Sequence, residues 1–176
     1  MPASIPDRPT QDEYAPYYAR YITRVPAGDL LTLLADQAAT FRATFGSQAE
    51  SRAGFRYAPG KWSLREVIGH LIDTERVFTF RAISFARGDQ HPLPSFDQDA
   101  WVPPAQFDAR PLDTLVDEWA AQRAATIAMV RGLPEDALKR RGIASDFSFT
   151  VSALLHIPHG HLEYHFEHVR THYGVG

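Results

Sequence analysis

The sequence of 176 residues contains no cysteine. This absence excludes disulfide bonds, thiolate metal ligands and a cysteine nucleophile. Any metal site in the chain must therefore use the nitrogen and oxygen atoms of histidine, carboxylate and water.

The sequence also lacks an excess of charge of one sign and any long apolar run. The formal net charge is −3, and no cluster of Lys and Arg occurs, so the electrostatic signature of a nucleic-acid-binding protein is absent. No stretch of about 18 apolar residues and no secretory signal pattern is present. We expect a soluble, cytoplasmic protein that binds neither nucleic acid nor membrane.

The composition favours one globular domain over residues 1–176. Hydrophobic residues make up 44% of the chain and aromatic residues 12%, which is enough for a sizeable core. Residues 1–26 are rich in proline and predict an irregular arm. Its four tyrosines indicate that the arm packs on the rest of the domain; they are Tyr14, Tyr17, Tyr18 and Tyr21.

Four amphipathic patterns predict four helices. The first follows Asp29, a candidate N-cap, and stops at Gly46. The second opens with the capping box Ser63–Glu66 and runs to Gly88. The third covers Leu112–Arg131, a short helical turn is expected over 134–140, and the fourth helix begins near Thr150, with a kink expected at Pro158.

The connection over 88–111 is longer than a compact bundle needs. Its five prolines argue against regular structure, but loops of this length are usually functional, and its aromatic residues favour an ordered loop. Because no convincing alternating strand pattern appears, the fold class is all-α. We predict an antiparallel four-helix bundle with helices about 20° from parallel, an irregular N-terminal arm and a long loop between helices two and three.

Six of the eight histidines lie between 156 and 172. At about 100° per residue, His161, His165, His168 and His172 form one stripe beside an apolar stripe of the same helix. Two imidazoles four residues apart can reach one metal ion. The last two histidines are also explained by the favourable interaction of a basic residue with a helix C-terminus.

His70 is the candidate for a third ligand. It lies in line with Val67 and Leu71, on or beside the buried face of the second helix. Alone, such a histidine is most often a core residue that hydrogen-bonds to the backbone. Since metal sites in bundles are built from facing helices, we predict a metal site made of His70, His161 and His165.

Three neutral imidazoles suit zinc, nickel or ferrous iron. Three protein ligands leave coordination positions for water or substrate, as in catalytic sites, whereas structural zinc sites have four protein ligands. His168 and Glu163 are candidates for a fourth ligand, but neither is clearly directed to the same point. A divalent ion lowers the pKa of a coordinated water or thiol and so supplies a nucleophile near neutral pH.

At these residues the sequence resembles the DinB-like (YfiT-like) superfamily of bacterial metal-binding four-helix bundles. The resemblance is carried by YAPYYARYITRVPAGDLL, GKWSLREVIGHLIDTERVFTFRAISFARGD, FDQDAWV and TVSALLHIPHGHLEYHFEHVRTHYG. It implies one ligand in the second helix and an H-x-x-x-H pair in the last, matching His70, His161 and His165. Related sequences often read GHExHH; here Tyr164 stands where an extra histidine is common.

The resemblance implies a metal-dependent enzyme acting on a small-molecule substrate. Relatives include thiol S-transferases that use bacillithiol or mycothiol, a thiol-dependent isomerase and an iron-binding module. The expected function is a thiol S-transferase or a hydrolase-like enzyme in stress or detoxification metabolism, with a low-molecular-weight thiol as co-substrate or water in its place. The alternatives are a non-enzymatic metal-binding or dimerisation module and a purely structural bundle. The sequence allows a homodimer.

Charged residues near these elements are candidates for proton transfer or for orienting the imidazoles. The carboxylates are Asp73, Glu75, Asp97, Asp99 and Glu163. Arg76 and Arg81 are candidates for binding an anionic thiol, although arginines on amphipathic helices are usually surface residues. An enzyme is distinguished from a binding module by whether the long loop, with Phe96 and Trp101, walls a cavity at the histidines.

Overall fold

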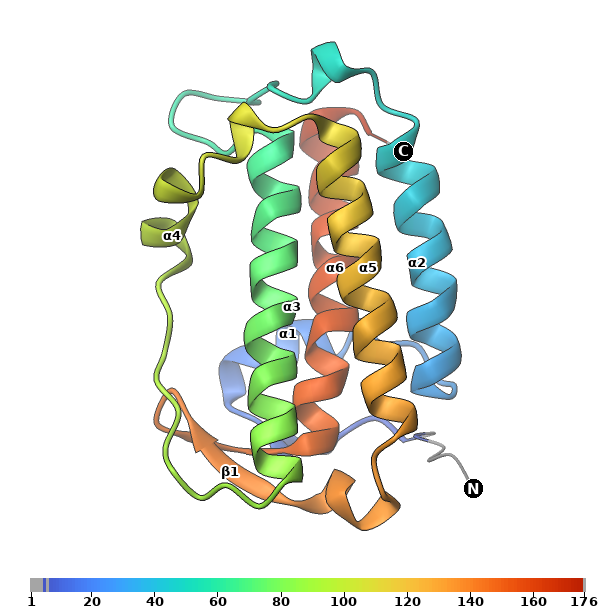
Figure 1. Cartoon of the computed structure of the whole chain (residues 1–176), viewed down its shortest axis with the longest axis vertical. Coiled ribbons are helices and arrows are strands. Elements are labelled where there is room, and N and C mark those ends of the chain that lie inside the picture. Colours follow the sequence, from blue (N-terminus) through green and yellow to red (C-terminus); the bar gives the residue numbers. More distant parts are fainter. Residues whose placement is uncertain (1–4, 6, 176) are drawn as a thin grey trace.

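The computed structural model describes residues 5 and 7–175 and contains a bundle of four long helices (Figure 1). The helices are α2 (Leu30–Gly46), α3 (Leu64–Ala86), α5 (Leu112–Arg131) and α6 (Val151–Tyr173). The predicted helical-bundle fold is therefore confirmed. Within the described part of the chain, none of the helices has the length and hydrophobicity of a membrane span.

The helices begin where the sequence places their caps. The side chain of Asp29 accepts a hydrogen bond from the backbone N–H of Thr32, and Thr150 accepts one from Ala153. Ser63 and Glu66 form the expected reciprocal capping box. These bonds satisfy N–H groups that have no partner inside the helix. At the other end of the chain, α6 continues without a break through Pro158.

The order of the helices around the bundle differs from their order in the sequence. The contacting pairs are α3–α6, α2–α5, α3–α5 and, less extensively, α2–α6. Consecutive helices α2 and α3 thus lie across the bundle from each other. In Figure 1, α3 and α5 both run downwards, whereas α2 and α6 run upwards. The pairs α3–α6 and α2–α5 are antiparallel, and α3 and α5 are parallel.

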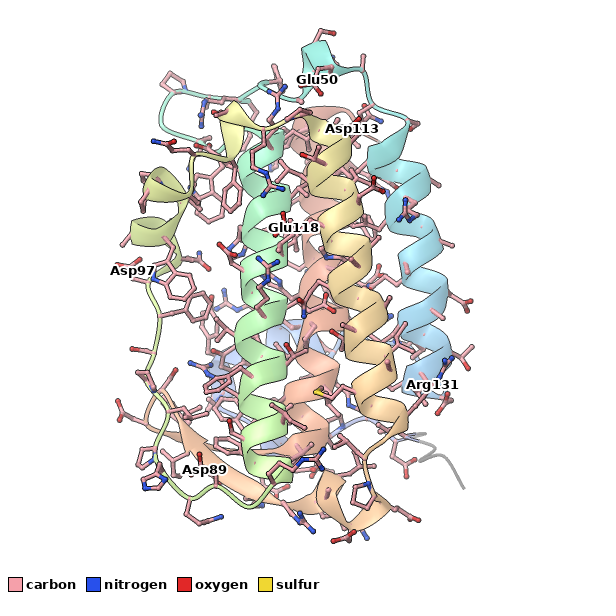
Figure 2. The ribbon with its side chains drawn as sticks, in the orientation of Figure 1. Glu50, Asp89, Asp97, Asp113, Glu118 and Arg131 are labelled. Atoms are coloured by element: carbon pink, nitrogen blue, oxygen red, sulfur yellow. The ribbon has the colours of Figure 1, made fainter. Side chains whose placement is uncertain are left out.

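The parallel arrangement of α3 and α5 explains the long connection between them. A helix of 20 residues such as α5 is about 30 Å long, and the chain must return over this distance before α5 can start. Figure 2 shows Asp89 near the lower end of the bundle and Asp113 near the upper end. We call residues 87–111 the crossover; it runs outside α3.

The crossover contains regular structure that the sequence did not predict. A helix, α4 (Gln98–Ala105), is followed by a 3-10 turn, Phe107–Ala109. The carboxylate of Asp97 caps α4 by accepting hydrogen bonds from the backbone N–H groups of Asp99 and Ala100. The prolines that argued against a helix lie in its second half, and the helix ends at Gln106, whose φ is +52°.

A short β-hairpin precedes α6, where the sequence predicted no strand. Strands β1 (Arg141–Ala144) and β2 (Phe147–Thr150) pair antiparallel, with Ala144 opposite Phe147. The two turn residues, Ser145 and Asp146, have φ values of +50° and +66°. Positive φ at both positions is typical of the tight turns that suit twisted strands.

The short helical turn predicted over 134–140, between α5 and the hairpin, is confirmed as a 3-10 helix, Glu135–Lys139.

The N-terminal arm lies against α6. It contains two 3-10 turns, Gln11–Glu13 and Pro16–Tyr18, and the short helix α1 (Ala19–Ile22). Tyr14 and Tyr21 are buried, and α1 contacts α6. Residues 1–4 and 6 of the predicted arm lie outside the described residues.

A polar layer divides the hydrophobic core into two clusters. The two nitrogens Nε and Nη2 of Arg123 on α5 donate to the carboxylate of Glu75 on α3 at 2.9 and 3.0 Å. Nη1 of Arg123 donates to Gln37 of α2 at 2.8 Å, and Gln37 donates to the carbonyl of His159 on α6. All four long helices thus contribute to a continuous hydrogen-bond network, which Thr126 of α5 and Glu163 of α6 extend.

We expect Glu75→Gln to lower the free energy of unfolding by about 3 to 5 kcal/mol, because it leaves the buried cation of Arg123 without its counter-charge. Chemical denaturation monitored by circular dichroism measures this change. The control is Asp117→Asn, which breaks the exposed pair with Arg42 and should have little effect. Equal effects of the two substitutions would contradict a structural role for the buried pair.

Candidate metal centre

Three histidine side chains from two antiparallel helices meet inside the bundle. His70 comes from α3, and His161 and His165 come from consecutive turns of α6. Nε2 of His161 lies 3.1 Å from Nε2 of His70 and 3.1 Å from Nε2 of His165. The three side chains are buried, and their candidate ligand atoms all lie within 4.8 Å of one another. The structure therefore brings together the three predicted ligands.

This arrangement of nitrogens fits a cation better than it fits protons. One Nε2 atom acts either as a donor or as an acceptor, so His161 cannot form a good hydrogen bond with both neighbours at once. Nitrogens at about 2.0 to 2.1 Å from one metal ion lie roughly 3 Å from one another. The observed separations of 3.1 Å agree with that spacing.

The other ring nitrogen of His70 has a partner that orients the imidazole. Its Nδ1 lies 3.3 Å from Oγ1 of Thr74, one turn further along α3. When Nδ1 donates to this oxygen, Nε2 keeps its lone pair for a metal. Nδ1 of His165 is buried and has no hydrogen-bond partner among the described residues.

Burial keeps the three imidazoles neutral. Loss of solvent lowers the pKa of His70 from 6.5 to about 4. It also lowers the pKa values of His161 and His165 well below 6.5, and the neighbouring imidazoles lower them further. Neutral imidazole is the form that binds a metal ion, so the site is prepared for ligation at physiological pH.

Aromatic side chains hold the histidines in place. The ring of Tyr21 stands edge-on to that of His161, with centroids 5.1 Å apart, and Trp62 lies 5.0 Å from His70. Gly160 permits the close approach of Tyr21 to α6, because a Cβ at position 160 would lie 2.0 Å from the backbone oxygen of Tyr21. The sequence predicted the tyrosines of the arm only as packing residues, and no sequence pattern marked Trp62 as part of the site.

The histidines line an open cavity of about 300 Å³. Its walls come from the N-terminal arm, the loop before α3, α3, α4 and α6. A second cavity of about 410 Å³ shares Tyr17, Tyr21, Gln98 and His161 with the first. His161 thus borders both spaces.

The crossover forms part of the cavity wall. Gln98 and Asp99, at the start of α4, line the histidine cavity, and Phe96 lines the second one. Trp101 instead lines a third cavity, against the outer face of α3. The crossover therefore contributes Gln98 and Asp99 to the wall of the histidine cavity, whereas Phe96 and Trp101 line the neighbouring cavities.

Asp99 is the predicted carboxylate that borders the histidine cavity. The other four have different surroundings. Glu75 is bound to Arg123, and Glu163 accepts a hydrogen bond from Gln37. Asp73 pairs with Arg76 and lines the third cavity, whereas Asp97 caps α4 and lines the second cavity.

The predicted cationic residues do not line the histidine cavity. Arg76 pairs with Glu118 on the surface, and Arg81 is buried beside the third cavity. Two other cations, Arg20 of α1 and Lys61 of the loop before α3, line the histidine cavity instead. His168 also borders it, and burial lowers the pKa of this histidine.

Comparison with known proteins agrees with this architecture. Among solved structures, YfiT from Bacillus subtilis, described as a probable metal-dependent hydrolase with an unusual four-helix bundle topology, matches with a TM-score of 0.73. The match covers 94% of this chain and 90% of that chain at 16% identity, so it shows a shared fold. No curated protein sequence matches. The model of the DinB superfamily matches residues 9–169, and the chain therefore belongs to the DinB superfamily.

Proposed function

We propose that this protein is a metal-dependent enzyme that activates a small thiol or water at His70, His161 and His165. The observation that carries this proposal is the meeting of three neutral Nε2 atoms at the wall of an open cavity. Three protein ligands leave room for a further ligand, as in catalytic metal sites. The description of YfiT as a probable metal-dependent hydrolase supports the same reaction class.

The donor set restricts the metal. Three imidazole nitrogens without thiolate suit zinc, nickel or ferrous iron, whereas calcium and magnesium prefer oxygen ligands. The bound ion would lower the pKa of a water or thiol coordinated to it. A low-molecular-weight thiol is the proposed co-substrate for transfer, and water takes its place in hydrolysis.

The surrounding residues supply the remaining functions of an active site. We assign proton transfer to Asp99, because it lines the same cavity as the histidines. Arg20 and Lys61 attract an anionic substrate to the same space. Tyr21, whose pKa is raised mainly by burial, stays protonated and holds the ring of His161.

A non-enzymatic metal-binding or dimerisation module would need the same three histidines. Such a module would not need a walled cavity next to them. The side chains of Gln98 and Asp99, which the crossover brings to the cavity, favour the enzyme.

Replacing His161 with Ala should abolish stoichiometric binding of zinc or nickel, because it removes the ligand that lies between the other two. Elemental analysis of protein purified without added metal, followed by titration with each ion, measures the stoichiometry. His91→Ala is the control, since His91 is an exposed residue of the crossover. Retention of one bound ion in His161→Ala with unchanged affinity would exclude the proposed centre.

Stabilisation by zinc should be complete above pH 6.5 and should decline as the pH falls towards 4. The unfolded chain binds protons on its histidines near pH 6.5, whereas the pKa of folded His70 is about 4. Metal ligation holds all three imidazoles neutral, so acid favours the unfolded, metal-free chain. The measurement is the zinc-dependent increase in Tm across this range. A constant increase throughout the acid range would argue against histidine ligation.

The metal-loaded protein should conjugate a small thiol to an electrophile or hydrolyse an ester or amide. A screen would test bacillithiol, mycothiol, glutathione and coenzyme A with model electrophiles, alongside hydrolysis substrates without thiol. Asp99→Asn should lower kcat by about a hundredfold with the metal content unchanged, because it removes the proton acceptor. The exposed control Asp117→Asn should retain activity. Equal rates for wild type and His165→Ala would remove the metal from the mechanism.

A further inference from the structure

Arg81 of α3 is a buried cation without a carboxylate partner among the described residues. Its exposed fraction is 1%. Nη2 donates to the backbone oxygen of Pro94 at 2.7 Å and to Oγ of Ser145 at 3.0 Å. Nη1 is buried and has no hydrogen-bond partner within the described residues. A buried guanidinium is costly unless an anion or a full set of acceptors compensates for its lost solvent.

The second fully buried arginine of the bundle shows how the same chain treats such a group elsewhere. Arg123 is bonded through two nitrogens to the carboxylate of Glu75, and its third nitrogen donates to Gln37. The hydrogen bonds of Arg81, in contrast, go only to uncharged oxygen atoms, those of Pro94 and Ser145. Arg81 is thus a buried cation that has no counter-charge among residues 5 and 7–175.

The other groups near Arg81 do not supply that counter-charge. The rings of Phe78 and Phe96 lie 5.4 and 5.9 Å from its guanidinium carbon, and such contacts are weaker than an ion pair. Tyr18 interacts with Arg81, but burial raises the pKa of this phenol above 10.0, so it is neutral at physiological pH.

Arg81 forms part of the wall of the third cavity, which has a volume of about 320 Å³. One wall is a stripe on the outer face of α3, spaced by three and four residues: Asp73, Arg76, Val77, Phe80 and Arg81. The opposite wall is the crossover, with Leu93, Pro94, Ser95, Phe96 and Trp101.

The remainder of this cavity is mostly apolar. Phe80 and Trp101 are two of the large hydrophobic side chains that remain exposed, at 59% and 44%. Phe96 packs against Trp101 with ring centroids 5.1 Å apart. Arg76 is paired with Asp73 and Glu118, so Arg81 is the cation of this cavity that has no acidic partner in the described chain.

We propose that this third cavity is a binding site for a small organic carboxylate, whose anionic group pairs with Arg81 and whose apolar body lies between Phe80 and Trp101. The volume is at the lower end of the range for small-molecule sites. A carboxylate would supply both the missing negative charge and an acceptor for Nη1, the nitrogen that has no hydrogen-bond partner among the described residues. The site is separate from the three histidines and does not depend on a bound metal.

The probe is 3-phenylpropionate, with the uncharged 3-phenylpropanamide and the short acid propionate as comparison ligands. Isothermal titration calorimetry with metal-loaded wild-type protein should show saturable binding of 3-phenylpropionate and much weaker binding of both comparison ligands. Because a carboxylate can also bind a metal ion, the titration is repeated with His161→Ala. The dissociation constant for 3-phenylpropionate should be the same in both proteins.

Two substitutions test the two parts of the site. Arg81→Gln should weaken binding of 3-phenylpropionate by about tenfold or more, because it removes the charge but keeps an amide donor for Pro94. Phe80→Ser alters an exposed residue, so the protein should remain folded while the affinity for 3-phenylpropionate falls. Arg42→Gln, on the surface of α2 and outside the cavity, is the matched control and should leave the affinity unchanged.

Three results would overturn the proposal. The first is the absence of saturable binding by 3-phenylpropionate at millimolar concentrations. The second is binding that disappears in His161→Ala, which would assign the carboxylate to the histidine centre. The third is a dimer, detected by analytical ultracentrifugation, that Phe80→Ser dissociates, since a second copy of the chain would then cover this face.

Discussion

The shared direction of α3 and α5 is the constraint on which the rest of the structure depends. Two helices that follow each other in the sequence and run the same way cannot be joined by a short turn, so the chain must travel back along the bundle. The crossover does this outside α3 and contains α4, which lies outside the bundle near the upper half of α3 in Figure 1. It therefore supplies wall residues to three cavities, including Gln98 and Asp99 at the histidine cavity.

The buried charged groups of the bundle lie where side chains of neighbouring helices can form hydrogen bonds with them. Glu75 and Arg123 lie between the two hydrophobic clusters, where each has several hydrogen-bond partners. The histidine cluster follows a different rule, because its three nitrogens face one another and leave room for a cation. The same low-polarity interior that makes the ion pair rigid keeps His70 neutral.

Local sequence signals predicted the helices and the three central histidines. Capping by Asp29, Ser63 and Thr150 depends on bonds within a few residues, so these starts could be read directly. The hairpin turn at Ser145–Asp146 lacks the glycine that usually marks such turns, and the prolines of α4 concealed a capped helix. The path of the crossover and the contact of Tyr21 with His161 depend on packing between distant segments, which no local pattern reports.

The positions of the histidines along the chain have a consequence for the unfolded state. His70 and His161 are 91 residues apart in the sequence, although their Nε2 atoms lie 3.1 Å apart. An ion held between them would close a loop of about half the chain and would act as a reversible cross-link in a sequence that has no cysteine. In the unfolded chain these residues are no longer held together and the ion is released, so the ion would stabilise the fold through its binding free energy rather than by constraining the unfolded chain as a disulfide does. The availability of the metal would then determine the stability of the folded protein as well as its activity.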